Sequence, residues 1–303
     1  MHRDTYTYPC DDGTGDAESK ERWIEEKTFN DLYRKKTGRH WISKPFNTKP
    51  QLYMHPADKV GAVLQIKTTS PIEPAPQGMS DNSLLTLEVL ATEPRLFKIP
   101  HFLSESEVAY LVSVGAKNVK RSLTGDWGGV SETRTSKNTW IERNSSPIIE
   151  KIFQRASDLL KIDEKVLTHG RQHDDGFAES LQLVHYDVDD KYDAHYDWGV
   201  EKGPRYITLL LYLNEPTAGG ETCFPRAKDA NPDPGIIVSL KIGSAALFYN
   251  IMPDGNADIM SLHAALPVHR GEKWLANFWI RDTTSGPEMT LDQLKVLAPK
   301  SEL

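Results

Sequence analysis

Between residues 181 and 281 the chain is a succession of short apolar segments that are separated by Gly, Pro and Asn. Apolar runs of this length, bounded by turn-forming residues, are typical of buried strands and are too short for ordinary helices. A chain that turns this often is restricted to folds made of many short strands. The expected strands cover residues 181–186, 205–213, 236–240, 245–249, 259–263 and 274–281.

Two helices are predicted upstream of these strands. Ser104 and Glu107 form a capping box, in which each side chain satisfies a backbone N–H group at a helix start. Ser146 and Pro147 mark a second start, and the apolar residues that follow recur at helical spacing. Residues 85–89 alternate as a half-buried strand does. These elements indicate an α+β, mainly β protein, with a closed or sandwiched barrel supported by helices.

The chain divides by composition into three parts. Residues 1–84 are rich in Asp, Lys, Thr and Pro, with a predicted helix around 20–36 and a Pro-rich patch at 71–76. We expect an N-terminal extension with a linker there, and the sequence leaves open whether it packs on the rest. Residues 85–285 are expected to form the domain that carries the motifs described below, and residues 286–303 a C-terminal tail.

Composition and termini bear on partners and compartment. A formal charge of −7 and a pI near 5.8 argue against nucleic-acid binding, and no apolar run approaches the roughly 18 residues of a membrane span. The last four residues, Lys-Ser-Glu-Leu, resemble an endoplasmic-reticulum retrieval signal, but no signal peptide begins the chain. We therefore expect the endoplasmic-reticulum lumen if an upstream signal is missing from this sequence, and the cytoplasm otherwise. The sequence does not fix the oligomeric state.

One pair of residues has the spacing of metal ligands. His195 and Asp197 are separated by one residue, so in an extended segment both side chains point to the same face and reach one ion. A His-x-Asp pair followed much later by another His is the ligand set of the two-His-one-carboxylate triad, which binds non-haem Fe(II) and leaves three positions open. His185 and Asp187 form a second pair with the same spacing. Spacing alone does not choose between the two pairs.

The more distant histidine is also ambiguous. His263 ends the predicted strand 259–263, whereas His269 follows Pro267 in a segment expected to be a solvated loop. A metal ligand needs a rigid support, which favours His263. Lys273, at the start of the last strand, supplies a cation for a dicarboxylate cosubstrate if it faces inward. Alternation along that strand leaves the inward and the solvent-facing orientations equally open.

A series of further stretches accompanies these residues in a fixed order between residues 94 and 282. They are Pro100-His101-Phe102-Leu103-Ser104, Arg134-Thr135-Ser136, Tyr186-x5-Tyr192-x2-His195-x-Asp197, Arg205 with Tyr212-Leu213-Asn214, Gly219-Gly220-Glu221-Thr222-x-Phe224-Pro225, Ser261-Leu262-His263-Ala264 and Gly271-Glu272-Lys273-Trp274. In order and spacing they closely resemble the catalytic domain of the prolyl 4-hydroxylases, the Fe(II)- and 2-oxoglutarate-dependent dioxygenases of peptidyl proline. The resemblance implies a double-stranded β-helix, or jelly-roll, core.

The resemblance also implies which residues bind the metal. The family's iron pair follows the Tyr-x5-Tyr-x2 stretch, and its distal ligand lies in Ser-Leu-His-Ala, which together indicate His195, Asp197 and His263. If Tyr186 points into the barrel, as in the family, the neighbouring His185 points out of it.

Further roles follow from the same resemblance. Lys273, as a catalytic residue, is implied to bind the distal carboxylate of 2-oxoglutarate together with the hydroxyl groups of Tyr186 and Thr222, and L-ascorbate is implied as a further cofactor. The residues implied to line the peptide site are Tyr192, Arg205 and Trp279.

The expected function is hydroxylation of proline in a proline-rich or collagen-like peptide with Fe(II), O2 and 2-oxoglutarate, which releases succinate and CO2. An alternative is a hydroxylase of lysine or of a small molecule with the same cofactors. A non-catalytic jelly-roll binding module is disfavoured, because all three ligand types and Lys273 are present. The chain departs from the family's pattern at Ala265-Leu266, Asp189-Asp190 and Asn277-Phe278. These departures bear on the identity of the substrate and touch no proposed ligand.

Overall fold

A computed structural model describes residues 52–123, 132–164, 167, 178–198, 205–227, 235–239, 241–253 and 257–281. Within these residues the strands form three antiparallel sheets. The largest contains, in spatial order, β1 (Val63–Lys67), β2 (Leu84–Ala91), β3 (Leu96–Ile99), β12 (Ala245–Tyr249), β8 (Arg205–Tyr212), β15 (Lys273–Arg281), β6 (Leu181–Tyr186), β5 (Lys137–Ile141) and β4 (Lys120–Arg121). The second contains β11 (Ile236–Val238), β10 (Thr222–Phe224), β13 (His263–Ala265) and β7 (Tyr192–His195), and the third pairs β14 (Val268–Arg270) with β9 (Ala218–Gly219).

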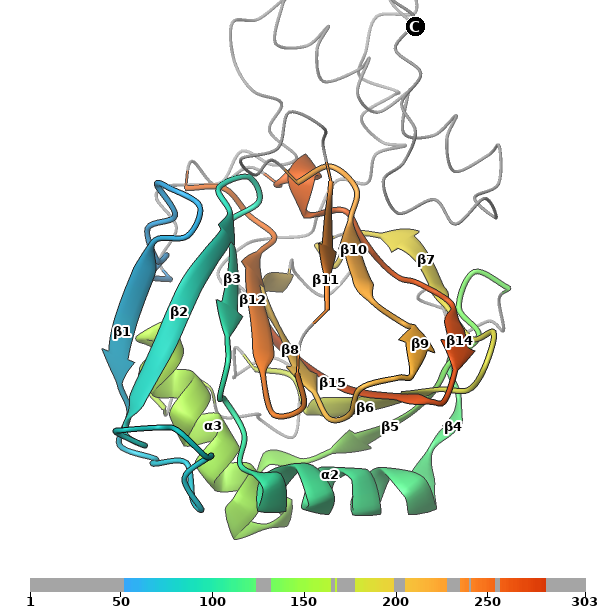
Figure 1. Cartoon of the computed structure of the whole chain (residues 1–303), viewed down its shortest axis with the longest axis horizontal. Helices are drawn as coiled ribbons and strands as arrows, with labels where there is room; N and C mark the ends of the chain where they lie inside the picture. Colours follow the sequence, from blue (N-terminus) through green and yellow to red (C-terminus); the bar gives the residue numbers. More distant parts are fainter. Residues whose placement is uncertain are drawn as a thin grey trace, which may run out of the picture.

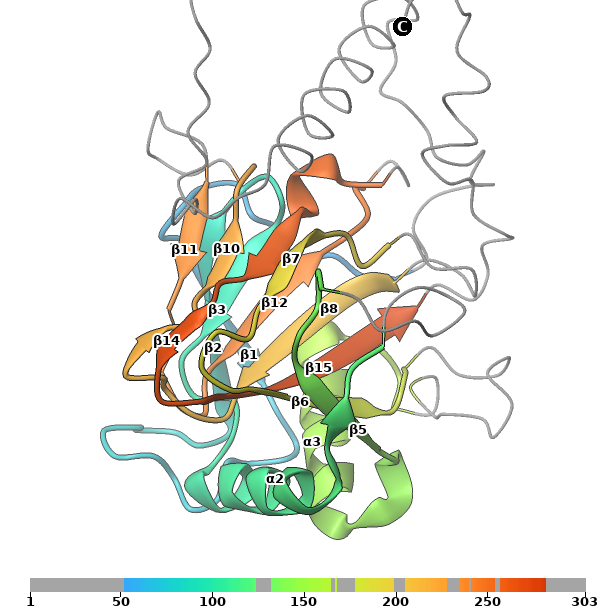
Figure 2. The ribbon, with the colours of Figure 1, turned by 90° about the vertical axis from the view of Figure 1, so that its right-hand side faces the viewer.

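The two larger sheets curve round a common centre, and this arrangement places the site. In Figure 1 the second sheet lies opposite strands β8, β15 and β6 of the largest sheet. The helices α2 (Glu105–Asn118) and α3 (Pro147–Leu160) cover the outer face of the largest sheet (Figures 1 and 2). The prediction of a mainly β protein with a jelly-roll core and supporting helices is confirmed.

Both helices begin where the sequence predicts. The Ser104 side chain accepts a hydrogen bond from the Glu107 N–H, and the Glu107 carboxylate accepts one from the Ser104 N–H, so the capping box is complete. The Ser146 hydroxyl accepts from the Ile149 N–H, with Pro147 in the first turn of α3. Each cap satisfies backbone N–H groups that have no partner inside the helix.

The main core lies between the helices and the outer face of the largest sheet. Along β15 the residues Trp274, Ala276, Phe278 and Ile280 belong to this core with side chains of α2 and α3. The alternate residues face the second sheet, and Leu275 there packs with a separate apolar cluster. Because β15 is buried on both faces, its sequence shows no apolar–polar alternation.

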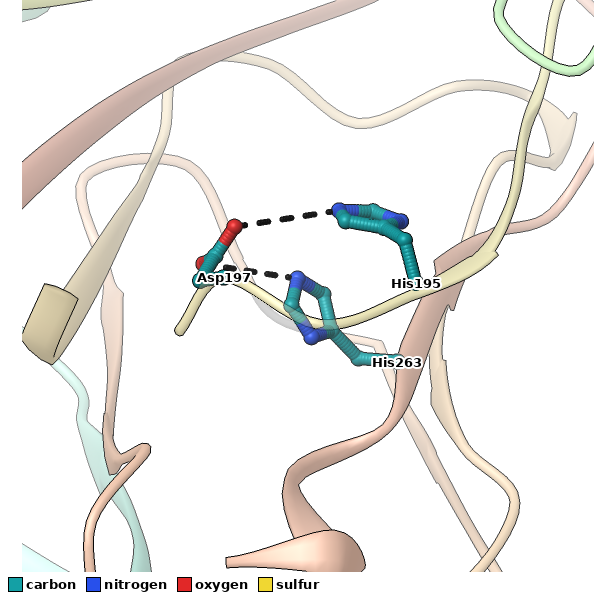
Figure 3. Close-up of side chains that lie close together, drawn as sticks. All are labelled: His195, Asp197 and His263. Atoms are coloured by element: carbon teal, nitrogen blue, oxygen red, sulfur yellow. Dashed lines mark ion pairs between the residues drawn. The ribbon is translucent and has the colours of Figure 1, made fainter. Parts of the chain in front are cut away.

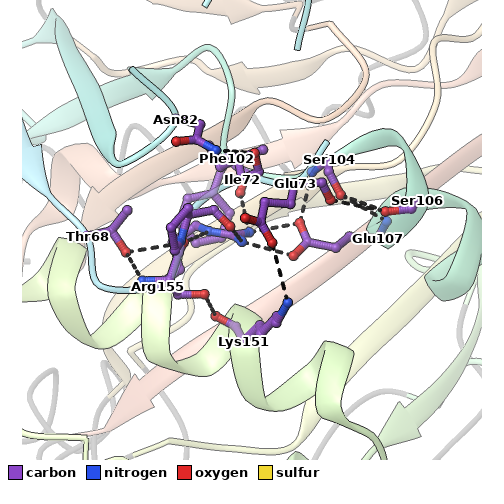
Figure 4. A network of polar contacts seen from close by, with 12 residues as sticks. Thr68, Ile72, Glu73, Asn82, Phe102, Ser104, Ser106, Glu107, Lys151 and Arg155 are labelled. Atoms are coloured by element: carbon purple, nitrogen blue, oxygen red, sulfur yellow. Dashed lines mark hydrogen bonds and ion pairs between the residues drawn. The ribbon is translucent and has the colours of Figure 1, made fainter. Parts of the chain in front are cut away.

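A buried ion pair joins both helices to the segment upstream of β2 (Figure 4). The Arg155 guanidinium on α3 donates to both carboxylate oxygens of Glu107 on α2, at 2.8 and 2.9 Å. It also donates to the carbonyl oxygens of Ser70, Pro71 and Phe102. A fully buried guanidinium requires this number of acceptors, because each unsatisfied N–H group would be costly.

The predicted boundary at residue 84 falls next to these contacts. Strand β1 pairs with β2 from Val63 opposite Glu88 to Lys67 opposite Leu84, so residues 63–67 belong to the largest sheet. The segment from residue 52 to residue 83 therefore packs on the part of the chain that carries the site. The helix predicted around residues 20–36 and the predicted tail at 286–303 lie outside the described residues.

The strand predicted at residues 259–263 is wrong. Residues Ile259–Ser261 form a 3-10 turn, η2, and β13 begins only at His263. Asp258 causes the turn: its carboxylate accepts from the Met260 N–H at 2.9 Å, and its carbonyl oxygen accepts from the N–H and the hydroxyl of Ser261. These local bonds replace the pairing with a neighbouring strand that an extended segment would make.

No helix among the described residues combines the length and the apolar character that crossing a membrane requires.

Candidate active site

Strand pairing brings His195, Asp197 and His263 together (Figure 3). His195 is the last residue of β7 and His263 the first of β13, and the two strands are antiparallel neighbours in which these histidines lie directly opposite each other. Asp197 follows two residues after His195. The Nε2 atom of His195 lies 3.9 Å from Asp197 Oδ1, and that of His263 lies 3.6 Å from Asp197 Oδ2. One ligand atom from each residue fits within 4.8 Å of the others, which is close enough to share one ion.

The two imidazoles are oriented with their Nε2 atoms toward Asp197. The Nδ1 atom of His195 lies 2.8 Å from the Asp193 carbonyl oxygen, and that of His263 lies 2.9 Å from the Ser261 carbonyl oxygen. A carbonyl oxygen only accepts, so Nδ1 of each ring carries a proton, and in the neutral form of the ring this leaves the Nε2 lone pair for a metal. Burial and the neighbouring His263 lower the pKa of His195, so its ring is neutral and fit to bind a metal at physiological pH.

Asp197 is ionised although it is buried. Burial alone would raise its pKa, but electrostatic interactions with His263, Arg205 and His195 and a hydrogen bond from Thr208 outweigh that effect and lower it. The described residues therefore present two imidazoles and one carboxylate, the donor set of a non-haem Fe(II) site.

The two competing histidines lie elsewhere. His185 is on the outer face of β6, where its ring lies 4.3 Å from that of Trp274 and its Nε2 atom lies 2.8 Å from Glu272. It points away from the centre of the barrel, as the resemblance implied, and it is buried. His269 is exposed on β14, in a strand where the sequence predicts a loop.

Lys273 faces inward and has no partner. It lies opposite Tyr186 in the pairing of β15 with β6, its side chain is 2% exposed, and its ammonium nitrogen makes no hydrogen bond with the described residues. The nitrogen lies 5.3 Å from the centre of the Tyr186 ring. Burial lowers the pKa of Lys273 to about 8, and the charge of Glu221 only partly offsets this. An unpaired buried ammonium group fits a site that receives an anion.

Tyr212 joins the predicted pair of hydroxyl residues. Its hydroxyl donates to Thr222 Oγ1 at 2.8 Å, and burial raises its pKa, as does the proximity of Tyr186. Tyr212 therefore holds Thr222 and lies near Tyr186, whereas the sequence marked it only as part of a matching stretch. Its position on β8, one strand away from Lys273, became visible only in the sheet order.

Comparison with known proteins identifies the family. Residues 181–281 match the model of the 2OG-Fe(II) oxygenase superfamily. Prolyl 4-hydroxylase 2 of Arabidopsis thaliana is 35% identical over 215 residues, which cover 63% of this chain and 68% of that protein. Probable prolyl 4-hydroxylase 3 of the same plant is 34% identical and covered to 71%. The chain belongs to the prolyl 4-hydroxylase family. It is a 2-oxoglutarate-dependent dioxygenase, as the sequence predicted.

Among solved structures, the chain is similar to the viral collagen prolyl hydroxylase of Paramecium Bursaria Chlorella virus-1 in its 2OG complex. The identity is 29%, the TM-score is 0.46, and the alignment covers 61% of this chain and 95% of that one.

The three residues predicted to line the peptide site of this prolyl 4-hydroxylase surround the metal ligands. Tyr192 stacks on His195, with ring centres 3.6 Å apart and an interplanar angle of 18°. The Arg205 guanidinium lies 3.5 Å from the centre of the Trp279 ring, and the Trp279 indole N–H donates to Asp197 Oδ2 at 3.0 Å. The structure therefore places all three beside the ligands.

Further residues at this end of the barrel were missed. Trp140 on β5 is 46% exposed and its ring lies 6.0 Å from that of Trp279. Glu179 accepts from Arg205 at 2.6 and 3.0 Å and so fixes the guanidinium over the indole ring. Arg134, which the sequence already marked in the stretch Arg134-Thr135-Ser136, also lies here, 4.7 Å from the centre of the Tyr192 ring. The aromatic character of Trp140 was a visible signal, but its place on the inner face depends on the pairing of β5 with β6.

Proposed function

We propose that this protein hydroxylates proline in a peptide, with Fe(II) held by His195, Asp197 and His263 and with 2-oxoglutarate held through Lys273. The observation that carries the proposal is the unpaired, buried Lys273 on the inner face of the same barrel as a metal-ligating triad. The prolyl target is supported by the identity of 35% to a relative named prolyl 4-hydroxylase.

The triad supplies three ligands and leaves one face of the ion open. Two neutral imidazoles and one carboxylate would reduce the charge of Fe(II) to about one positive unit, which favours a further anionic chelator. When bound, Fe(II) with 2-oxoglutarate and O2 supplies the oxidising chemistry that places one oxygen atom on the proline ring and the other in succinate, with loss of CO2.

Lys273 would pair with the distal carboxylate of 2-oxoglutarate. The ammonium group is already desolvated in the ligand-free protein, so pairing with an anion removes an existing penalty. Hydroxyl groups of Tyr186 and Thr222 would complete the site for this carboxylate, as the resemblance implied, with Tyr212 holding Thr222 in place.

The aromatic residues would bind the peptide. Proline-rich segments adopt an extended helix that docks on aromatic surfaces, and Tyr192, Trp279 and the exposed ring of Trp140 provide such surfaces beside the triad. Arg205 would orient a peptide carbonyl group while it remains paired with Glu179. Requirements for L-ascorbate and for the endoplasmic-reticulum lumen stay predictions from the sequence.

Mass spectrometry of reacted peptides tests the proposal. The purified protein is incubated with Fe(II), 2-oxoglutarate, ascorbate and one peptide at a time. The three peptides are a proline-rich one, a collagen-like one and a lysine-containing one without proline. Addition of one oxygen to proline, with an equal amount of succinate, is the expected result. Oxygen on lysine alone, or on no peptide while succinate forms with small molecules, would replace the prolyl assignment. Absence of metal binding and of succinate would indicate a binding module.

A further inference from the structure

The two oxygen atoms of Asp197 have different surroundings. Oδ2 accepts two hydrogen bonds, from the Thr208 hydroxyl at 2.7 Å and from the Trp279 indole N–H at 3.0 Å. Oδ1 accepts none from the described residues, and the nearest cationic nitrogen, in the Arg205 guanidinium, is 3.7 Å away. Each carboxylate oxygen offers about two lone-pair sites, so Oδ2 is filled and Oδ1 is free.

A third residue, Asn250, hydrogen-bonds to the Thr208 hydroxyl. Asn250 is fully buried, and its side-chain amide donates to Thr208 Oγ1 at 2.8 Å. A carboxylate only accepts, so Thr208 must give its single hydroxyl proton to Asp197 and must accept from Asn250. The chain from Asn250 through Thr208 to Asp197 therefore has one possible polarity, and it is buried along its whole length.

We propose that Thr208, oriented by Asn250, and Trp279 are positioning residues that reserve Asp197 Oδ1 for the metal and keep the carboxylate a one-oxygen ligand. The inference rests on the proposed function. A carboxylate that bound through both oxygens would occupy two coordination positions. The facial triad needs three open positions, two for the chelating cosubstrate and one for O2. The two hydrogen bonds to Oδ2 would keep that oxygen off the metal, so that all three positions stay open.

Asn250 also connects the carboxylate to the second histidine segment. Its backbone carbonyl oxygen accepts from the Asp258 N–H at 2.8 Å, and its backbone N–H donates to the Tyr206 carbonyl oxygen at 2.9 Å. Asp258 in turn caps η2, the turn that leads into His263. Asn250, directly after β12, thus connects Thr208, the donor to Asp197, with the turn that leads into His263.

Metal binding by hydroxyl variants tests the inference. Co(II) alone, added to the full-length protein, is the probe, because its visible absorption reports coordination number and geometry. Thr208→Val keeps the shape of the side chain and removes the hydroxyl, and it should weaken Co(II) binding by about 10- to 100-fold, as loss of a hydrogen bond to a metal ligand typically does. It should also change the absorption spectrum. Thr208→Ser should restore both properties.

A matched control separates positioning from general damage. Thr68 is a buried threonine whose hydroxyl donates to the Asp158 carboxylate at 2.9 Å, remote from the triad, and Thr68→Val should bind Co(II) like the wild type. Trp279→Phe removes the other donor and should change the spectrum in the same direction as Thr208→Val. It carries the test if Thr208→Val does not fold. Asn250→Leu should give a smaller loss, because the Thr208 hydroxyl is kept but no longer oriented.

The outcomes are distinguishable from failure of the proposed function. Wild-type protein that binds no Co(II) would overturn the metal site and with it the inference. If the wild type binds Co(II) and Thr208→Val shows the same affinity and spectrum, only the positioning role is overturned. The same holds for Trp279→Phe where that variant carries the test. A Thr208→Ser variant as impaired as Thr208→Val would show that the hydroxyl is not the cause.

Discussion

Replacing Lys273 with methionine should make the ligand-free protein more stable and bind 2-oxoglutarate more weakly. The ammonium group is buried without a partner among the described residues, and its pKa is lowered from 10.5 to about 8, chiefly by burial. At about 1.4 kcal/mol per pKa unit, this lowering corresponds to a free-energy penalty of about 3 kcal/mol for the charged form in the folded protein. Below pH 8 the lysine is charged in both the folded and the unfolded state, so the folded protein bears this whole penalty. Methionine has a similar length and no charge, and it should therefore raise the free energy of unfolding by up to about 3 kcal/mol near neutral pH.

The pH dependence gives the effect a sign that can be checked. Between about pH 8 and pH 10.5 the folded state has released the lysine proton and the unfolded state still binds it. The unfolded state then binds more protons, so the stability of the ligand-free wild type rises with pH across this window. The advantage of Lys273→Met should shrink by about 1.4 kcal/mol for each pH unit above 8 and disappear above about 10.5.

The effect on 2-oxoglutarate has the opposite sign. Removal of one member of a buried ion pair costs roughly 3–5 kcal/mol, because the other charge is left unpaired. Lys273→Met should therefore weaken 2-oxoglutarate binding by about two to three and a half orders of magnitude. In the wild type the affinity should fall by up to about tenfold for each pH unit above 8, because the ligand-free lysine loses its charge there.

Urea unfolding and calorimetric titration measure the two effects. Unfolding of metal-free protein at pH 7 and pH 9 gives the stability difference, and titration of 2-oxoglutarate into protein loaded with Mn(II) gives the affinity. Lys241→Met is the matched control, because that side chain is 83% exposed, and both quantities should change by less than about 1 kcal/mol. A destabilised Lys273→Met at pH 7, or a loss of affinity below tenfold, would refute the placement of an unpaired ammonium group in the cosubstrate site.

Three further predictions concern single residues. His263→Ala should abolish metal binding, measured by anaerobic titration, and succinate formation, measured in a turnover assay. His269→Ala, on the exposed strand β14, should match the wild type in both assays. Equal loss in the two variants would contradict the ligand assignment. Glu107→Gln should lower the free energy of unfolding, measured in urea, by about 3 kcal/mol, because the buried Arg155 guanidinium loses its counter-charge. Glu215→Gln, in an exposed pair with Lys241, should lower it by less than about 1 kcal/mol. Gly115→Ala should lower the thermal unfolding midpoint although alanine favours helix, because a Cβ atom there would lie 2.5 Å from the indole ring of Trp274. A raised midpoint would show that this ring moves aside.

The sequence by itself determined the elements whose signals are local. The bounds of β6 at residues 181–186 and of β12 at 245–249 were predicted as the structure has them, because each is an apolar run between turn residues. The capping box of Ser104 and Glu107 was visible for the same reason, since both partners lie in one turn. The error at 259–263 also had a local cause, because the capping effect of Asp258 was overlooked.

The tertiary structure decided which of these elements meet. His195 and His263 become neighbours only through the pairing of β7 with β13. Spacing in the sequence did not choose between the His195 and His185 pairs, and only the predicted strand favoured His263 over His269. Whether Lys273 faces inward could not be read from β15, because a strand buried on both faces lacks the alternation that reports orientation.

The hydrogen bonds around the carboxylate were the part furthest from prediction. Thr208, Asn250 and Trp279 lie on three different strands or strand ends, and no local pattern marks them as partners of Asp197. Residue types in a sequence limit which groups can donate or accept. Only the sheet order and the side-chain directions it imposes decide which donor reaches which oxygen, because a hydrogen bond forms only within a few tenths of an ångström and a narrow range of angles.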